Sequence, residues 1–354
     1  MNQAKRHILP FFIPMLGCVS HCVYCDQYSI SGQAEMPSPG QIEREALAYA
    51  GTCPGQLAFY GGSFTALPWK MQEAYLQAVQ PAFACGRIDS IRVSTRPDAI
   101  SSEAVDRLAA YGVTTVELGI QSFDAEVLKA SGRAYSSDTA CRSCELVRAA
   151  GLTLGIQLMT GLPLDSRQKS LRSMAQGCDM GADFFRIYPT LVLRNTALAI
   201  AYEQELYQPQ ELAEAAQLAA DLLALALERG CPVIRLGLNP SPSLEKALVS
   251  GPYHPAFGQI ARGALKLQQA LLLLEQAGGK PLALRYPARE RPLLFGQKNE
   301  QWQMLQGLYG GLSVQADDGL PLGSLQALPE NAEAITLNQD EFLKYYVGLL
   351  RAQI

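Results

Sequence analysis

The first half of the chain alternates short apolar runs with amphipathic segments, and this alternation strongly limits the folds it can adopt. The apolar runs are 7–13, 57–60, 91–95, 115–120, 154–159 and 184–188, and the helix-like segments are 39–51, 68–84, 101–111, 124–131, 137–150 and 166–180. Gly112 and Gly151 each follow such a segment, as glycine commonly does at a helix end. Apolar strands that alternate with helices form parallel sheets. We therefore predict an α/β fold with an open, partial (β/α)6 barrel rather than a complete (β/α)8 barrel.

The pattern changes after Pro189, and we place a domain boundary near residue 200, between regions 1–200 and 201–354. The second region is predicted to hold helices at 209–229 and 259–277, a strand at 233–238, a Pro/Gly/Ser-rich loop at 239–258, and a β–α–β module at 281–326 with a polar tail. The module has a glycine-containing loop at 296–299 before its helix, an order similar to KH modules that bind nucleic acid. A plain α/β cap or a dimer surface fits that order equally well. We expect the second region to be a helical and α/β cap that recognises the substrate.

Composition and charge narrow the possible partners and the compartment. The net charge of −4 argues against a broad basic surface for non-specific nucleic-acid binding, although a local basic patch is compatible with it. The apolar start of the chain contains Pro10 and Pro14 and lacks a signal cleavage site, so we interpret it as a buried strand. No apolar run is long enough to span a bilayer, so we expect no membrane partner. Nine cysteines without an export signal indicate reduced thiols in the cytoplasm.

Three of these cysteines, Cys18, Cys22 and Cys25, follow the first predicted strand within eight residues. A loop after a strand lies on the ligand-binding face of a parallel barrel. Zinc would need a fourth ligand, and His21 is available, but neighbouring residues such as His21 and Cys22 rarely bind one metal together. A disulfide is disfavoured by the compartment, and so close a group is unusual for core packing alone. Three thiolates in one loop fit an iron–sulfur cubane with one open iron.

The Cys-x3-Cys-x2-Cys spacing, with Tyr24 before the last cysteine, resembles the signature of the radical S-adenosylmethionine (SAM) superfamily. This resemblance implies that Cys18, Cys22 and Cys25 bind a [4Fe-4S] cluster whose fourth iron binds SAM. It also implies an oxygen-sensitive enzyme that cleaves SAM reductively to a 5′-deoxyadenosyl radical. The electron donor would be a protein of the flavodoxin or ferredoxin type.

The same resemblance assigns SAM contacts to residues at the ends of later strands. The expected cofactor-binding residues are Tyr24, Gly61, Gly62, Ser63, Ser94, Gln121, Arg133, Gln157, Gly161, Leu162 and Pro163. The backbone at 61–62 would hold the SAM amino group, and Arg133 would make a charge-assisted contact to its carboxylate. Gln121 and Ser94 would bind ribose or methionine atoms, and the backbone at 161–163 would lie beside adenine. The glycine pair at 61–62, taken without the cysteines, is typical of an ordinary βα turn.

Within the superfamily, the chain resembles two groups. One is the radical SAM part of the Elongator catalytic subunit, with the likeness concentrated at 86–122 and 183–200. The other is the oxygen-independent coproporphyrinogen oxidase type, which has acidic residues where Ser94 and Gln157 stand here. We find no acetyl-CoA loop pattern, so we do not expect the acetyl transfer of the Elongator subunit.

Three functions follow from these resemblances. The first is a radical SAM enzyme that modifies RNA, specifically a tRNA base. The second is a radical SAM enzyme that acts on a small metabolite or a tetrapyrrole. The third is a haem-trafficking binding protein, a function that occurs among relatives of the coproporphyrinogen oxidase type. The sequence assigns no catalytic residue beyond the cofactor site.

Other residues are expected to have structural roles. Cys141 and Cys144 lie on one face of a predicted helix, where they would pack against the sheet rather than bind a second cluster. Arg186, Tyr188 and Arg194 flank the end of the sixth strand, on the expected substrate side. Pairing with an acidic segment is the alternative for each arginine.

Overall fold

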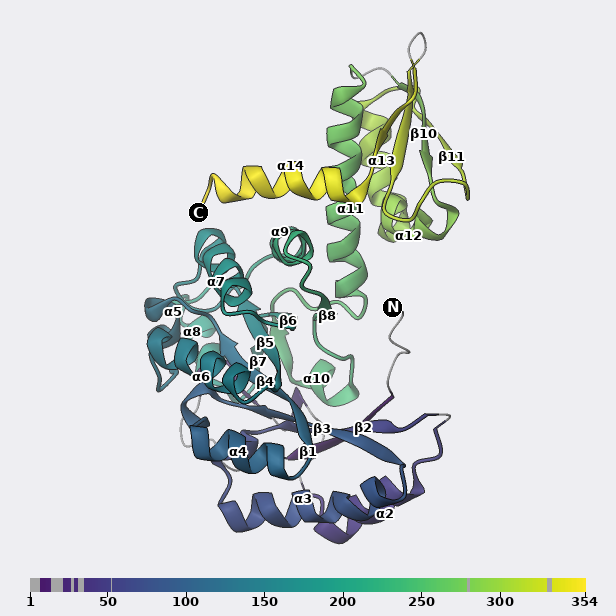
Figure 1. Ribbon diagram of the computed structural model, residues 1–354. Helices are drawn as coiled ribbons and strands as arrows, with labels where there is room; N and C mark the ends of the chain where they lie inside the picture. Colours follow the sequence, from purple (N-terminus) through teal and green to yellow (C-terminus); the bar gives the residue numbers. More distant parts are fainter. Residues whose placement is uncertain are drawn as a thin grey trace.

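The computed structural model describes residues 7–13, 22–26, 29–30, 35–51, 53–278, 281–329 and 333–354. Within them the predicted partial barrel is confirmed: a parallel, seven-stranded sheet in the order β1-β2-β3-β4-β5-β6-β8 curls into a half-barrel (Figure 1). The strands are β1 (Ile8–Ile13), β2 (Gly55–Gly61), β3 (Ile88–Thr95), β4 (Val113–Gln121), β5 (Thr153–Thr160), β6 (Phe184–Pro189) and β8 (Val233–Leu236). The helices between them are α2 (Pro39–Ala48), α3 (Trp69–Ala84), α4 (Ser102–Ala110), α5 (Ala125–Ala130), α6 (Ser137–Ala149) and α7 (Arg167–Asp179).

The two faces of this sheet differ because successive side chains on a strand point to opposite faces. One face is apolar, and its fully buried side chains, such as Leu118, Ile156 and Ile187, belong to the main hydrophobic core with the surrounding helices. The other face carries most of the polar side chains of the strands. A ligand inside the half-barrel would therefore meet a polar wall supported by an apolar layer.

Local sequence explains where the helices of the barrel begin. Ser101, Ser136 and Ser166 precede α4, α6 and α7, and each side-chain oxygen accepts a hydrogen bond from a backbone N–H in the first turn. Such caps satisfy donors that the helix itself leaves without partners. They fix the loops that follow the strands, which is where the predicted cofactor residues lie.

The half-barrel includes chain beyond residue 200, where the sequence predicts its end. Strand β8 pairs in parallel with β6 and adds a seventh strand to the sheet. Helix α9 (Leu212–Glu228) packs beside α7 and α11 (Phe257–Gln276). The assignment of residues 201–354 to a separate domain stays a prediction.

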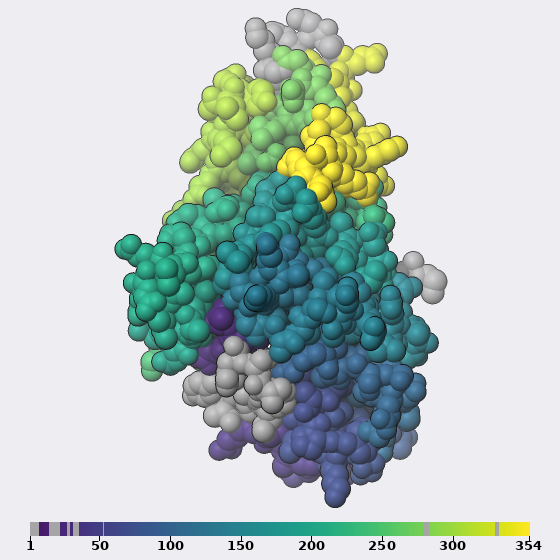
Figure 2. All heavy atoms as spheres, turned by 90° about the vertical axis from the view of Figure 1, so that its left-hand side faces the viewer, coloured from purple at the N-terminus to yellow at the C-terminus, as the bar shows by residue number. Residues whose placement is uncertain are grey.

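The C-terminal region holds a second, smaller sheet in the order β11-β10-β12-β13. Its strands are β10 (Pro281–Tyr286), β11 (Ser313–Ala316), β12 (Leu325–Pro329) and β13 (Ile335–Leu337), and α12 (Arg291–Phe295) and α13 (Glu300–Leu308) lie between the first two. Strands β10 and β11 are parallel, which confirms the predicted β–α–β order. Figure 2 shows this region, in yellow-green, above the barrel in blue and teal, with the C-terminal helix in yellow at the junction.

Several elements of this half were not predicted. The expected loop at 239–258 contains α10 (Pro242–Ala247) and β9 (Leu248–Ser250), and β9 pairs with β7 (Val192–Leu193). Helix α8 (Ala197–Glu203) follows β7. The expected polar tail forms β12, β13 and the long helix α14 (Gln339–Arg351), which crosses α9 (Figure 1). The missed signal for α14 is a capping box, in which Asn338 and Glu341 each bind the other's backbone N–H.

A buried carboxylate on α9 ties α14 to the barrel. Asp221 is fully buried, and it forms an ion pair of 2.9 Å with Arg167 at the start of α7. It also accepts a hydrogen bond of 2.6 Å from the Tyr346 hydroxyl on α14. The C-terminal helix is therefore joined to the half-barrel by a specific polar contact.

None of the helices in the described ranges is both long enough and apolar enough to cross a membrane.

Candidate cofactor site

Two of the predicted cluster ligands, Cys22 and Cys25, lie on one tight turn. The Cys25 N–H donates to the Cys22 carbonyl over 3.0 Å, and both side chains are half-buried. Val23 fixes the turn from both sides, because its N–H donates to the Ser131 carbonyl and its carbonyl accepts from the Leu198 N–H. Cys18 and His21 lie outside the described residues. Among the residues that are described, no three His, Cys, Asp or Glu side chains gather into a metal site.

Tyr24, which the resemblance counts among the cofactor residues, anchors this turn in a small apolar cluster. Its side chain is buried with Val127, Leu162 and Leu198. Burial raises the pKa of the Tyr24 hydroxyl well above its ordinary value, so the phenol stays neutral. Tyr24 and Leu162 thereby hold the cysteine turn against the loops that follow β4 and β5.

Arg133 lies directly beside the cysteine turn. Its Nη1 donates to the Cys22 sulfur over 3.5 Å, and its Nη2 donates to the Gly119 carbonyl at the end of β4. The guanidinium stands 5.3 Å from the centre of the Tyr135 ring, whose hydroxyl donates to the Gly119 and Ile120 carbonyls. A guanidinium held in this way is a suitable partner for an anionic ligand at the cysteines.

Three buried polar atoms of residues that are predicted to bind SAM have no hydrogen-bond partner among the described residues. They are Arg133 Nε, Gln121 Oε1 and Ser94 Oγ. Gln121 ends β4 with a φ of 68°, a left-handed conformation that a non-glycine residue adopts at a cost. Because buried polar atoms almost always have partners, these three atoms fit a bound polar ligand such as SAM. The donor set therefore suits the cofactor that the cysteines imply.

Residues 61–63 have partners within the protein. A side chain at Gly61, where φ is 99°, would place its Cβ 2.6 Å from the Ile13 carbonyl oxygen, so only glycine fits there. The Gly62 N–H donates to that same carbonyl over 2.7 Å. The buried Ser63 hydroxyl hydrogen-bonds to Thr95 and accepts from the Arg96 N–H. These contacts join the ends of β1, β2 and β3, and the predicted SAM contacts at 61–63 stay predictions.

The loop at 161–163 is also held by protein contacts. The Gly161 N–H donates to Asp165, and the Gly161 carbonyl accepts from the Tyr207 hydroxyl over 2.6 Å. Leu162 is buried beside Tyr24, and Pro163 is half-buried. These contacts shape the loop, and its predicted position beside adenine stays a prediction.

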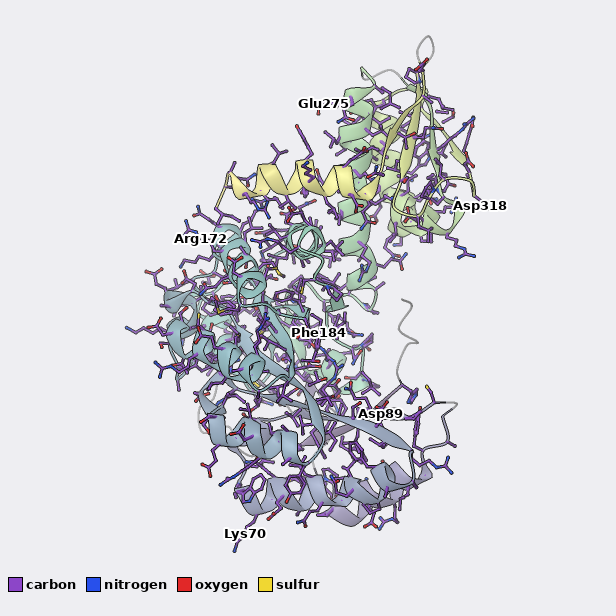
Figure 3. All side chains as sticks on the ribbon, viewed as in Figure 1. Lys70, Asp89, Arg172, Phe184, Glu275 and Asp318 are labelled. Carbon is purple, nitrogen blue, oxygen red and sulfur yellow. The ribbon has the colours of Figure 1, made fainter. Side chains whose placement is uncertain are left out.

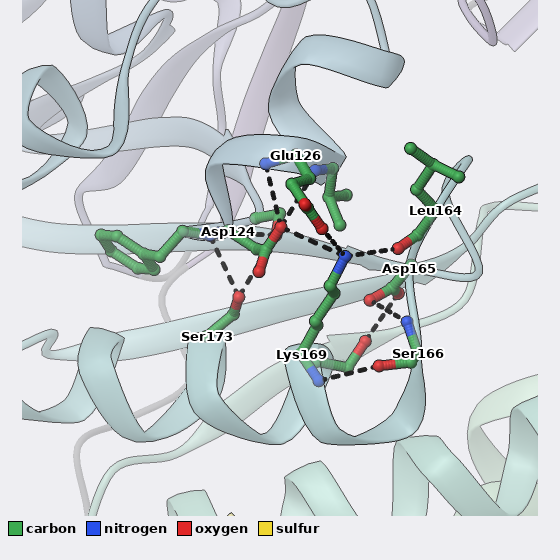
Figure 4. A network of polar contacts seen from close by, with 11 residues as sticks. Asp124, Glu126, Leu164, Asp165, Ser166, Lys169 and Ser173 are labelled. Carbon is green, nitrogen blue, oxygen red and sulfur yellow. Dashed lines mark hydrogen bonds and ion pairs between the residues drawn. The ribbon is translucent and has the colours of Figure 1, made fainter.

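A polar network connects this loop to the segment that carries Arg133. Lys169 reaches the Leu164 carbonyl, Glu126 and Asp124, and Asp124 caps the N-terminus of α5 (Figure 4). On the other side, Asp165 accepts from the Ser166 N–H and from Ser170 (Figure 4). The loops after β4 and β5 are thus held in a fixed relation next to the cysteine turn.

Deeper in the half-barrel, the polar side chains surround the carboxylate of Glu117 on β4, which is fully buried. Arg92 lies 2.6 Å from its Oε1, and Arg186 lies 3.1 Å from its Oε2. Gln157 donates to Oε2 over 2.9 Å, and Arg186 also donates to the Tyr60 hydroxyl over 2.8 Å. The amide of Gln157 is therefore engaged by Glu117, and its predicted contact with SAM stays a prediction.

Part of this network was missed because the strands were interpreted as continuously apolar. Arg92 stacks over Phe184, 5.0 Å from the ring centre, and Figure 3 labels Phe184 at the start of β6. Gln56 accepts from Arg92, and Arg235 on β8 is the register partner of Arg186. The missed signal is a period of two, since polar residues occupy every second position of these strands. Arg194, in contrast, is exposed, and its Nε donates to the backbone carbonyl of Lys246.

Cys141 and Cys144 lie on α6, a helix that packs on β4 and β5 of the sheet. Cys144 is fully buried in the main core, and burial raises the pKa of its thiol to about 12. Cys141 is half-buried and accepts a hydrogen bond from Gln176 on α7. A neutral, buried thiol is a poor metal ligand, because metals bind the thiolate.

We expect that replacing Cys141 and Cys144 together by serine leaves the iron content of the reconstituted protein unchanged. The measurement is iron per folded chain after anaerobic reconstitution. Cys144→Ala with Cys141→Ala is the matched variant, since a buried serine hydroxyl can cost about 1–3 kcal/mol of stability. Loss of about half of the iron in either folded variant would instead indicate a second cubane.

Comparison with known protein families gives two adjacent matches. The model described as Radical SAM superfamily matches residues 12–174. The model described as Radical_SAM C-terminal domain matches residues 182–267. Together they span more than half of the chain, including the cysteine turn, the ends of β2 to β5 and the strand β8.

Two curated proteins show the range of its relatives. The chain is 25% identical over 249 residues to a tRNA uridine(34) acetyltransferase of Dehalococcoides mccartyi, a match that covers 59% of this chain and 54% of that protein. It is also 25% identical over 202 residues to the heme chaperone HemW of Escherichia coli, covering 55% of this chain and 53% of HemW. The chain thus spans about half the length of these curated relatives.

Among solved structures, the fold is similar to that of the archaeal Elp3 of Methanocaldococcus infernus with an N-terminal deletion. The TM-score is 0.55 at 20% sequence identity, and the match covers 78% of this chain and 64% of that one. At this identity the likeness is one of fold.

Proposed function

Because the chain belongs to the radical SAM superfamily, whose enzymes use a [4Fe-4S] cluster and SAM, we propose that it cleaves SAM reductively and uses the resulting radical to modify tRNA. The observation that carries this proposal is the contact of Arg133 with Cys22, together with the partnerless polar atoms of Arg133, Gln121 and Ser94. When bound, the cluster would supply the electron that breaks the sulfonium bond and yields methionine and a 5′-deoxyadenosyl radical.

The residues of the site have distinct roles in this proposal. Cys18, Cys22 and Cys25 hold the cluster through their thiolates and leave one iron open for SAM. Arg133 binds the SAM carboxylate through its Nε, while its Nη atoms keep their contacts with Cys22 and Gly119. The Gln121 and Ser94 side chains bind polar atoms of the ribose or of methionine. The apolar layer around Tyr24 limits the access of water to the cluster loop.

We expect that Arg133→Ala weakens SAM binding by about 1.5–3 kcal/mol, since a hydrogen bond to a charged group is lost. Gln121→Ala should cost less, about 0.5–1.5 kcal/mol, because a neutral hydrogen bond is lost. The measurement is a SAM titration of each reconstituted variant, with iron assayed in parallel and expected to stay at the wild-type level. Wild-type affinity in Arg133→Ala would contradict the assigned role. Loss of iron in that variant would show that Arg133 supports the cysteine turn instead.

Two observations support tRNA as the substrate. The matched relatives include proteins named tRNA uridine(34) acetyltransferase. In the C-terminal region, the loop at 296–299 joins α12 to α13, and Lys298 and Arg291 are exposed there without an ion pair to any described carboxylate. Such a loop is suited to contact a nucleic-acid backbone. Asp318, after β11, is exposed and Asp317 is half-buried, and their negative charge argues against a phosphate contact beside them.

The second candidate is a small metabolite or tetrapyrrole substrate, or haem trafficking. The observation that favours it is the match to the heme chaperone HemW over 55% of this chain. A tetrapyrrole carries carboxylates, which the arginines of the half-barrel could bind.

One experiment separates these candidates. The protein is reconstituted anaerobically, reduced, and given SAM together with total tRNA, with the small-molecule fraction of a cell extract, or with neither. We expect tRNA to increase the yield of 5′-deoxyadenosine, and Cys22→Ala to give none under any condition. Stimulation by the small-molecule fraction alone would contradict tRNA as the substrate and support the second candidate.

A further inference from the structure

The polar face of the half-barrel holds two arginines side by side. Arg186 on β6 and Arg235 on β8 are register partners on neighbouring parallel strands, so their side chains leave the same face of the sheet. Gln157 on β5 is the register partner of Arg186 on the other side, and its amide binds Glu117. Arg186 and Arg235 therefore share the interior face with Glu117.

The positive charge on this face exceeds the negative charge. Glu117 already has Arg92 on one carboxylate oxygen, and Arg186 and Gln157 on the other. Arg235 donates from Nε to the Gly237 carbonyl over 2.8 Å, and no Asp or Glu of the described ranges forms an ion pair with it. Arg92 and Arg186 thus share the carboxylate of Glu117, and Arg235 is left without a counter-ion among the described residues.

Within the pair, Arg186 has Glu117 as its counter-ion, whereas Arg235 has no anionic partner among the described residues. Burial lowers the pKa of Arg235, the neighbouring Tyr188 raises it, and the positive charge of Arg186 lowers it. Two half-buried cations side by side repel each other in a region where water screens them little. An anion between them would remove this repulsion and use the planar donor forks of both guanidinium groups.

Two phenols complete the surroundings. Arg186 donates to the Tyr188 hydroxyl over 3.4 Å and to the Tyr60 hydroxyl over 2.8 Å. Each phenol accepts a hydrogen bond from the arginine, so its own proton can be donated to an oxygen of a ligand. Arg186 and Arg235 are both half-buried rather than sealed, which leaves a route for a ligand.

We propose that Arg186, Arg235 and Tyr188 form an anion-binding site inside the half-barrel, which holds a phosphate or carboxylate group of the substrate. The inference rests on the proposed function, because it places the substrate in the barrel with the radical. It adds that the substrate carries an oxyanion close to the group that reacts. A phosphate would fit a nucleotide, and a carboxylate would fit a small acid or a tetrapyrrole.

The test measures the binding of inorganic phosphate and, separately, of acetate to the whole protein. Binding is measured by calorimetry and by the shift in the thermal unfolding temperature. We expect one of these anions to bind with a 1:1 stoichiometry and to raise the unfolding temperature as its concentration rises. Arg235→Gln should weaken this binding at least about tenfold. Arg235→Lys should retain part of it, because the charge stays while the planar fork is lost. Arg194→Gln is the matched control, since Arg194 is exposed, and it should bind as the wild type does.

The outcomes separate this inference from the proposed function. In buffer without the anion, Arg235→Gln should unfold at the wild-type temperature or above, because a repelling charge is removed. A lower unfolding temperature in that buffer, together with unchanged anion binding, would show that Arg235 is structural and overturn the site. Failure of both anions to bind the wild type would overturn it as well. Absence of 5′-deoxyadenosine from wild-type protein with intact anion binding would instead contradict the proposed function alone.

Discussion

Replacing Glu117 by glutamine is expected to lower the free energy of unfolding by about 3–5 kcal/mol. The carboxylate is fully buried and is the shared counter-ion of Arg92 and Arg186. Glutamine keeps the shape but removes the charge, so two largely buried guanidinium groups lose their partner. The side-chain amide of the new glutamine would also point N–H groups at neighbouring donors. In the wild type, the carboxylate accepts a hydrogen bond from Gln157 at this position.

The measurement is urea unfolding of the protein without cofactor, followed by circular dichroism. The matched control is Glu103→Gln, which removes the same charge from an exposed i,i+4 ion pair with Arg107 on α4. That change should cost less than about 1 kcal/mol. A lower urea midpoint, with an unchanged dependence of the unfolding free energy on urea concentration, would show that the substitution lowers the stability of the folded state. Equal effects of the two substitutions would contradict the role given to Glu117.

Replacing Cys22 by alanine is expected to abolish the iron–sulfur cluster. A cubane held by three protein thiolates loses one of these ligands in the variant. The wild type should contain about four irons per chain after anaerobic reconstitution, and the variant essentially none. The measurement is iron and sulfide per chain, with the visible absorbance of the cluster.

Two controls make this result specific. Cys53→Ala removes an exposed cysteine distant in sequence from the loop and should retain the full iron content. The fold of Cys22→Ala should persist, since Cys22 is only half-buried and the turn is held through the backbone of Val23. Full iron in a folded Cys22→Ala variant would contradict its assignment as a ligand. A stable content of one zinc in the wild type would overturn the cluster itself.

The sequence was sufficient to predict the half-barrel because its signals are local. Six apolar runs, each followed by a helix, set the strand order through the rules for parallel connections. Five of these six strands contain all the residues predicted for them, and β1 begins at Ile8, one residue after its predicted start. The seventh strand, β8, was predicted as a strand, but its partner was not, because pairing with β6 depends on the path of α9.

The C-terminal elements were harder to predict for physical reasons. Strands β12 and β13 are short, and they pack against α11, a helix that is distant from them in the sequence. Helix α14 packs on α9 across the junction, although its capping box was a readable local signal.

The sequence predicted which residues belong to the cofactor site but not which residues they contact. The sequence brings Cys22, Gln121 and Arg133 to one side of the barrel, and the structure places Arg133 in contact with Cys22. It could not show that Ser63 and Gln157 bind protein partners, since those partners lie on other strands. Arg186 was placed on the substrate side, but its pairing with Glu117 and the presence of Arg92 and Arg235 on the same face were missed. The charge balance of a face emerges only when the strands are assembled.

The central claim is that SAM binds beside a cluster held by the cysteine turn. The most direct measurement is electron paramagnetic resonance of the reduced, reconstituted protein with and without SAM. The account predicts a signal from one cubane that changes when SAM is added, because SAM binds the open iron. We also expect that the Arg133→Ala variant requires a higher SAM concentration to give the same change in the resonance signal. A cluster signal that is indifferent to saturating SAM, or protein that binds zinc and gives no signal, would contradict it.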